Sequence, residues 1–270
     1  MSAWPLPNPD LFSPPINHVS LGLDADDVEG WSKFFADITL PEALNKAVPK
    51  RKAEFLAGRY CARQALARAA AGRAPFDALV PTRADRAPAW PEGYVGSITH
   101  TKGFVAAAAA RADDVRSIGL DSEHVMTAET AENVRSMVAL EGELAALADS
   151  GLDPIRLLTL VFSAKETLYK CLHPLVGRFF GFHEARLTSV DLAGRRYHIE
   201  LVGGLSDEFR DGARFGGRFA FDHGLVHTGM ALAARGGAGP ESHGAARGGA
   251  PENHGGARGG AGPENHGGGA

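Results

Sequence analysis

Two acidic side chains end a short apolar segment of the sequence. Asp121 and Glu123 follow the apolar residues 118–120 and lie two positions apart. Because alternate residues of a β-strand point to the same face, a strand here would present both carboxylates side by side. Paired carboxylates repel each other unless a cation lies between them, and oxygen ligands favour Mg²⁺. The pair therefore indicates a metal site, although a turn cap at Asp121 beside a solvated Glu123 is the alternative.

A second group of charged residues lies in a segment with helical character. Ser163 precedes Glu166 by three residues, which is typical of a capping box at a helix start. Glu166 and Lys170 are four residues apart and would share one helix face. With Lys165, they would place one carboxylate and two ammonium groups near a helix N-terminus, which suits phosphate oxygens and a metal. A surface ion pair between Glu166 and Lys170 is the alternative.

Basic residues gather around a predicted helix over residues 53–71. Eight basic residues and one acidic residue lie between positions 46 and 73, in a chain whose total charge is −4. Arg51 precedes the helix and Arg59 lies within it. Because guanidinium groups bind phosphate oxygens in pairs, this clustering favours an anion site over a solvated helix face. His100 ends a predicted strand, where either a structural role or a phosphate contact is expected.

The elements that would position these residues alternate along the chain. A second strong helix is predicted over 154–172, and weaker helices over 41–50, 127–136 and 141–150. Strands are predicted over 94–97, 103–110, 117–120, 186–190, 197–202, 214–221 and 225–233. Since each half has one long helix and a few strands, we expect an α+β fold of two similar α/β halves. Residues 236–270, rich in glycine and without any aromatic residue, are predicted to form a disordered tail.

The composition excludes several classes of protein. A chain of 270 residues, 44% hydrophobic, can bury the core of one large or two small domains. Its longest apolar run, residues 104–110, is too short for a membrane span, and its first ten residues lack the pattern of a secretory signal. Two cysteines cannot organise a disulfide scaffold, and the acidic balance argues against a general nucleic-acid binder. We expect a cytoplasmic protein.

Four segments carry a family resemblance through their order and spacing. They are residues 51–59 (RKAEFLAGR), 96–100 (GSITH), 118–123 (IGLDSE) and 162–170 (FSAKETLYK). In this order they resemble the 4′-phosphopantetheinyl transferases, specifically the pseudo-dimeric type that includes the enterobactin synthetase component D and surfactin-activating enzymes. The resemblance implies an N-terminal half over 1–112 with the phosphate contacts and a C-terminal half over 113–235 with the metal site. The tail, 236–270, lies outside it.

The family's reaction is what the resemblance implies for this chain. Such enzymes transfer the 4′-phosphopantetheine arm of coenzyme A to a serine of a carrier protein and release adenosine 3′,5′-bisphosphate. Acyl, polyketide and nonribosomal-peptide carriers all qualify, and siderophore assembly is one setting. The resemblance also implies Mg²⁺, or Mn²⁺ in its place, and a coenzyme A site in the cleft between pseudo-twofold halves. A monomer is expected because both halves lie in one chain.

Roles for individual residues also follow from the resemblance. The metal ligands would be Asp121, Glu123 and Glu166. The contacts to the nucleotide phosphates would be Arg51, Arg59, Thr99 and His100. Arg83 and Arg86 would contact the adenine and its 3′-phosphate, while Lys165 and Lys170 would steady the pyrophosphate. Glu166 would also be the general base, and Lys170 would stabilise the leaving phosphate.

Two positions depart from the family pattern, and two other functions are alternatives to this interpretation. Ser122 lies where the family often has an apolar residue, and its hydroxyl could add a metal ligand; Phe162 lies where many relatives have tryptophan. A Mg²⁺-dependent phosphohydrolase or nuclease could use the same carboxylates without a carrier protein, and a non-catalytic nucleotide-binding protein is a further alternative. Three phenylalanines, Phe179, Phe180 and Phe182, could line an apolar groove for a carrier or belong to the core.

Overall fold

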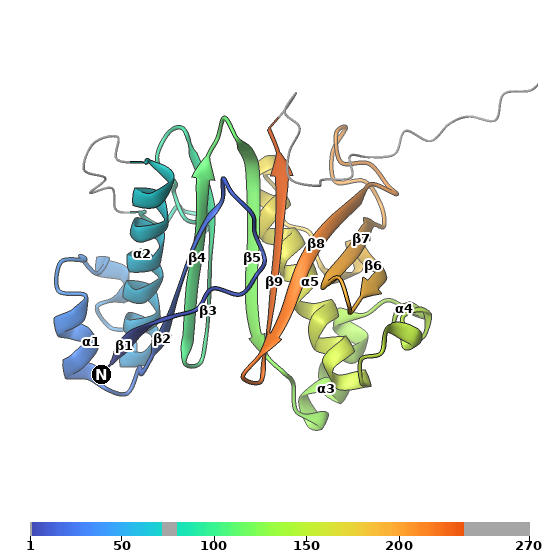
Figure 1. The fold of residues 1–270 in the computed structure, drawn as a ribbon, viewed down its shortest axis with the longest axis horizontal. Coiled ribbons are helices and arrows are strands. Elements are labelled where there is room, and N and C mark those ends of the chain that lie inside the picture. Colours follow the sequence, from blue (N-terminus) through green and yellow to red (C-terminus); the bar gives the residue numbers. More distant parts are fainter. Residues whose placement is uncertain (1, 72–79, 235–270) are drawn as a thin grey trace, which may run out of the picture.

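The computed structural model describes residues 2–71 and 80–234 and contains two antiparallel sheets side by side (Figure 1). The predicted tail therefore lies outside the described residues. The first sheet has the order β1-β2-β4-β3, with bounds Ala3–Leu6, Asn17–Leu23, Phe104–Arg111 and Tyr94–Thr101. The second has the order β5-β9-β8-β7-β6, with bounds Val115–His124, Leu225–Ala233, Arg214–Asp222, Arg196–Leu201 and Ala185–Asp191.

Each sheet is covered by one long helix. Helix α2 (Pro49–Ala69) packs on the first sheet and helix α5 (Pro154–Val176) packs on the second (Figure 1). In each half, one strand precedes the long helix, and the last strand after the helix pairs with that preceding strand. The pairs are β4 with β2 and β9 with β5. This shared path confirms the predicted α+β fold with two related halves. The chain crosses between the sheets after Arg111.

Smaller helices complete the two halves. They are α1 (Val28–Phe34), α3 (Ala128–Val138) and α4 (Glu143–Ala146), with short 3₁₀ turns at Glu42–Leu44, Ala148–Ser150 and Phe182–Glu184. The predicted helix over 41–50 is therefore only one 3₁₀ turn, because α2 itself begins at Pro49. Pro49 occupies the first turn of α2, where its missing N–H is harmless. None of the described helices combines the length and apolar character that a membrane span requires.

Helix α5 begins at Pro154, as predicted, nine residues before the capping box predicted at Ser163. Asp153 is its N-cap, and its carboxylate accepts hydrogen bonds from the backbone N–H groups of Ile155 and Arg156. Ser163 is instead buried in the middle of the helix. The capping box was therefore a wrong prediction, and the positive end of the helix dipole is not close to Glu166.

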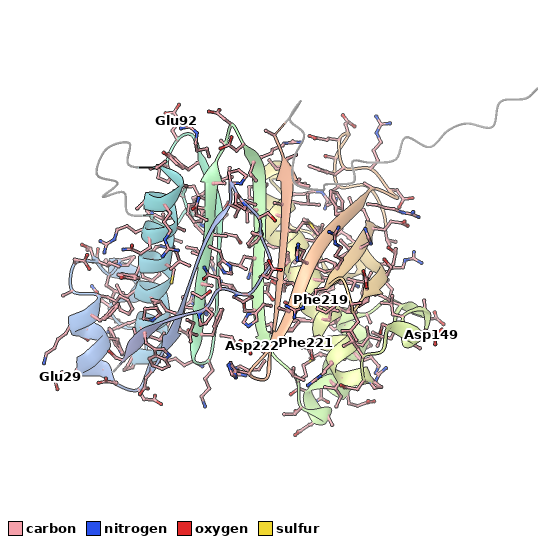
Figure 2. The ribbon with its side chains drawn as sticks, in the orientation of Figure 1. Glu29, Glu92, Asp149, Phe219, Phe221 and Asp222 are labelled. Carbon is pink, nitrogen blue, oxygen red and sulfur yellow. The ribbon has the colours of Figure 1, made fainter. Side chains whose placement is uncertain are left out.

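Apolar side chains form a core on both faces of the joined sheets. The alanines of β4 alternate: Ala107 and Ala109 pack toward α2, whereas Ala106 and Ala108 pack into a core on the opposite face. Under α5, Phe219 and Phe221 of β8 meet edge to face at 5.9 Å (Figure 2). The core on the face opposite the long helices contains residues of both sheets and therefore joins the two halves.

The N-terminal segment also connects the two halves. After β1, the chain passes over the second sheet, where Leu11 and Phe12 pack on Gly229 of β9. A Cβ at position 229 would lie 2.9 Å from the Leu11 Cβ, so only glycine fits this approach. Asp10 forms an ion pair with Arg218 at 2.7 Å. These contacts attach the first half to the back of the second.

Candidate active site

Three carboxylates gather where β5 faces helix α5. Asp121 and Glu123 point to the same side of β5, as the strand alternation predicted, and Glu166 comes from α5; each of the other two carboxylates acts electrostatically on Glu123. Gly119 permits this close approach, because a Cβ there would lie 2.0 Å from the Thr167 carbonyl oxygen. The residues predicted as metal ligands therefore lie within electrostatic reach of one another.

Asp121 is the most tightly held of the three acidic side chains. It is 2% exposed. Its Oδ2 accepts a hydrogen bond from the Ser163 hydroxyl at 2.7 Å, and its Oδ1 accepts one from the Lys170 ammonium at 2.6 Å. Ser163 in turn contacts Thr228 of β9. Ser163 was missed as a site residue because it resembled a helix cap, although an internal serine on a helix face could have suggested a polar partner.

Burial of the two glutamates disfavours their charged forms. Burial, followed by the charge of Asp121, raises the pKa of Glu123 to about 7, against the opposing effect of Lys170. Burial also raises the pKa of Glu166, again with Asp121 adding to the effect and Lys170 opposing it. The cluster therefore lacks positive charge, since one ammonium group serves three carboxylates.

The donor chemistry of this cluster suits a hard divalent cation. All three side chains offer carboxylate oxygens, which are the ligands that Mg²⁺ and Mn²⁺ prefer. Within residues 2–71 and 80–234, however, no three acidic, histidine or cysteine side chains already converge as a complete metal site. The ammonium of Lys170 lies against Asp121 instead. The three carboxylates thus have the donor chemistry for a metal, while Asp121 is bonded to the Lys170 ammonium.

A basic group from α2 and β3 lies within electrostatic reach of the carboxylates. The Arg51 Nη1 is 3.4 Å from the His100 Nε2, and the His100 Nδ1 is 3.7 Å from the Glu54 carboxylate. Burial lowers the pKa of His100; Glu54 opposes this shift, while Arg51 and Lys170 add to it. Arg51 and His100 therefore form one electropositive group within electrostatic reach of Lys170. Glu54, which sequence reasoning did not select, is buried against that group.

The remaining predicted arginines lie near this basic group or in the following loop. The Arg59 Nη2 donates to the Thr82 hydroxyl at 2.7 Å, and burial lowers its pKa to about 10, so it stays charged at neutral pH. Among the described residues, its buried Nε has no hydrogen-bond partner. Arg83 and Arg86 are exposed in the loop after Thr82. That loop faces α5, because its Asp85 raises the pKa of Tyr169, after the larger effects of burial and Glu166.

The prediction for Lys165 was wrong. Its ammonium donates to the Glu143 carboxylate at 2.7 Å and to the Val138 carbonyl at 2.9 Å, and its side chain is 1% exposed. Glu143 also accepts from the backbone N–H groups of Leu140 and Leu187. Lys165 therefore lies on the buried face of α5, away from the carboxylate cluster, and cannot steady a pyrophosphate there.

Thr99 and Ser122 contact groups of the protein in place of the expected phosphate and metal. The Thr99 Oγ1 is buried and accepts a hydrogen bond from the Ser122 backbone N–H at 3.0 Å, and Ser97 does the same for Leu120. These contacts join the edges of β3 and β5. The Ser122 hydroxyl contacts the His227 Nδ1 at 2.9 Å on the opposite face of β5 from Asp121. The idea that Ser122 adds a metal ligand is therefore wrong.

The three phenylalanines after α5 have three different environments. Phe179 is 75% exposed and its ring lies 5.7 Å from that of Tyr169. Phe180 is buried, and Phe182 is half-buried against Phe162. Only Phe179 of this trio therefore presents a largely free ring, next to a tyrosine that neighbours Glu166.

Comparisons with known proteins agree with this geometry. Residues 40–110 match the model of the 4′-phosphopantetheinyl transferase N-terminal domain, and residues 117–210 match that of the 4′-phosphopantetheinyl transferase superfamily. The chain is 42% identical to the 4′-phosphopantetheinyl transferase Svp of Streptomyces mobaraensis over 200 residues, 73% of this chain and 78% of that protein. It is 39% identical to the transferase Npt of Nocardia iowensis, with 70% and 86% covered, and 36% identical to enterobactin synthase component D of Salmonella typhi, with 58% and 63% covered. The chain therefore belongs to the 4′-phosphopantetheinyl transferase superfamily, enzymes that activate carrier proteins.

Proposed function

We propose that this transferase takes the 4′-phosphopantetheine arm from coenzyme A and attaches it to a serine of an acyl, polyketide or nonribosomal-peptide carrier protein. The observation that carries the proposal is the nearness of two groups: three carboxylates with Lys170, and Arg51 with His100, which act on one another electrostatically. An acidic metal site beside a basic phosphate site suits a pyrophosphate donor. The enzyme would act as a monomer in the cytoplasm, where its donor is found.

The basic groups would hold the nucleotide part of the donor. Arg51 and His100 would bind its phosphates, and a bound phosphate would favour the protonated form of His100. Arg59 would reach the same phosphates through its buried and unpaired Nε. The exposed Arg83 and Arg86, on the loop that faces α5, would contact the adenine and its 3′-phosphate.

The carboxylates would hold a Mg²⁺ ion and move the proton. Asp121, Glu123 and Glu166 are the proposed ligands, and the bound cation would neutralise the developing charge on the pyrophosphate. Glu166 is the proposed base, since a raised pKa suits proton transfer near neutral pH. The carrier serine oxygen bonds to the pantetheine phosphorus while the bridging P–O bond breaks. The proton passes to Glu166, and adenosine 3′,5′-bisphosphate leaves with the bond electrons, stabilised by Lys170.

The exposed Phe179 ring marks the side from which the carrier would approach. It lies next to Tyr169, and Tyr169 neighbours the proposed base. The Arg178 guanidinium beside it already pairs with Glu184 at 3.3 Å, so the ring rather than this charge supports the proposed approach. Exposed aromatic side chains are common anchors at the centre of a protein interface.

The direct test is the intact mass of an apo carrier protein after incubation with the full chain, Mg²⁺ and coenzyme A. We expect a gain of one phosphopantetheine that a chelator abolishes. Asp121→Asn should remove the gain, whereas Asp149→Asn, an identical change at an exposed position in the 3₁₀ turn Ala148–Ser150 (Figure 2), should not. Release of phosphate from coenzyme A without any carrier would instead identify a phosphohydrolase.

A further inference from the structure

The ammonium of Lys170 lies against the carboxylate cluster that is proposed to hold the metal. It is 2.6 Å from the Asp121 Oδ1, and it acts electrostatically on both Glu123 and Glu166. Among the three carboxylates, Asp121 is the deepest. Lys170 therefore provides the positive charge of the site in the free protein.

Both oxygens of Asp121 are engaged. Ser163, fixed by Thr228, occupies Oδ2, and Lys170 occupies Oδ1. A divalent cation bound at Oδ1 would lie beside the ammonium, and two positive charges at that separation repel strongly. The ammonium and the cation therefore compete for one oxygen atom.

Lys170 is also the partner that can move. Its side chain is 28% exposed on a flexible stem, whereas the Asp121 side chain is 3% exposed and held from behind. Lys170 also lies within electrostatic reach of the basic group of Arg51 and His100, since it helps to lower the pKa of His100. A phosphate bound there would offer the ammonium a new anionic partner.

We propose that Lys170 keeps the metal position closed in the free enzyme and opens it when a pyrophosphate ligand binds. Building on the proposed function, this predicts that metal and coenzyme A bind with strong positive coupling, because the ligand draws the ammonium away from Asp121. Lys170 thus has a role before the reaction, in the order of binding, in addition to its proposed role on the leaving group.

The test measures Mn²⁺ binding to the full chain by electron paramagnetic resonance at pH 8, with and without coenzyme A. Without coenzyme A, we expect Lys170→Met to bind Mn²⁺ about tenfold tighter than the parent, because a competing charge is removed. Coenzyme A should tighten Mn²⁺ binding in the parent by a factor about tenfold larger than in the variant. Lys33→Met removes the same charge from an exposed lysine on α1, which pairs with Glu29 (Figure 2), and should change neither value.

Equal Mn²⁺ affinity of the free parent and free Lys170→Met, or equal coupling to coenzyme A, would overturn the proposal. Thermal unfolding of each variant establishes that it is folded, and Lys170→Gln replaces Lys170→Met if the latter is not. These readouts need no carrier protein. If Mn²⁺ binding behaves as expected but no carrier is modified, the proposed function fails while this inference stands. If a carrier is modified but Mn²⁺ binding does not respond to Lys170→Met or to coenzyme A as expected, this inference fails while the proposed function stands.

Discussion

Removal of the Lys165 ammonium should destabilise the protein without weakening coenzyme A binding. The Lys165–Glu143 pair is almost completely buried, at 1% and 0% side-chain exposure, and its Nζ–Oε2 distance is 2.7 Å. In Lys165→Met, Glu143 would remain as a buried charge that has lost its ion-pair partner, and the Val138 carbonyl would lose its donor. Removing one partner of such a pair costs about 3–5 kcal/mol. That is a large fraction of the roughly 5–15 kcal/mol by which a typical domain is stable.

Urea unfolding followed by circular dichroism measures this loss, and calorimetry measures the dissociation constant of coenzyme A. The double variant Lys165→Met/Glu143→Gln removes the buried charge and should recover part of the stability. Recovery should be incomplete, because Leu140 and Leu187 donate to different oxygens of Glu143 and a single amide oxygen can replace only one of them. Stability of Lys165→Met within about 0.5 kcal/mol of the parent, together with a weakened coenzyme A affinity, would refute the reasoning. That outcome would restore Lys165 as a phosphate contact.

Three further predictions concern the carboxylates, the basic group and the exposed phenylalanine. Glu166→Gln should lower kcat by about 10²–10⁴ with little change in coenzyme A affinity, whereas Arg51→Ala should mainly weaken that affinity; the opposite assignment in steady-state assays would reverse their roles. Burial raises the pKa of Glu123 from its ordinary value of 4.5 to about 7, so the side chain binds its proton more tightly when the protein is folded. Its contribution to stability is therefore complete below pH 4.5 and is lost as the pH rises to about 7, and Glu123→Gln should flatten that part of the metal-free melting profile. Phe179→Ala should raise the KM for the carrier and leave stability unchanged, whereas the buried Phe180→Ala should cost about 3–5 kcal/mol in urea unfolding.

Strand alternation was enough to predict the paired carboxylates. Asp121 and Glu123 are separated by one residue on a strand, and local geometry alone places them on one face. The same rule places Ser122 on the other face, next to His227, so its exclusion from the cluster could have been derived from the sequence. Glu166 and Lys170 likewise share a helix face by spacing alone.

The Lys165 prediction failed because a capping box was assigned to Ser163, inside the helix predicted over 154–172. That assignment ignored the stripe of Val161, Lys165, Leu168 and Leu172, which spacing places on one helix face and which is buried. Its partner Glu143 begins helix α4, 22 residues earlier in the chain, and no local pattern indicates that contact. The joining of β3 to β5 through Ser97 and Thr99 depends on the same kind of long-range information.

The core shared by the two sheets has a consequence for how the protein unfolds. Leu11 and Phe12 from the first half pack on β9 of the second, while Ile118 and Leu120 of β5 pack with Phe104 of β4. Neither half can open without exposing apolar surface of the other, so the chain should melt in one cooperative transition. In hydrogen exchange, the amides of β3 and β5 should then report a common opening free energy. The candidate site, which takes residues from both halves, should therefore stay formed until the whole folded part unfolds.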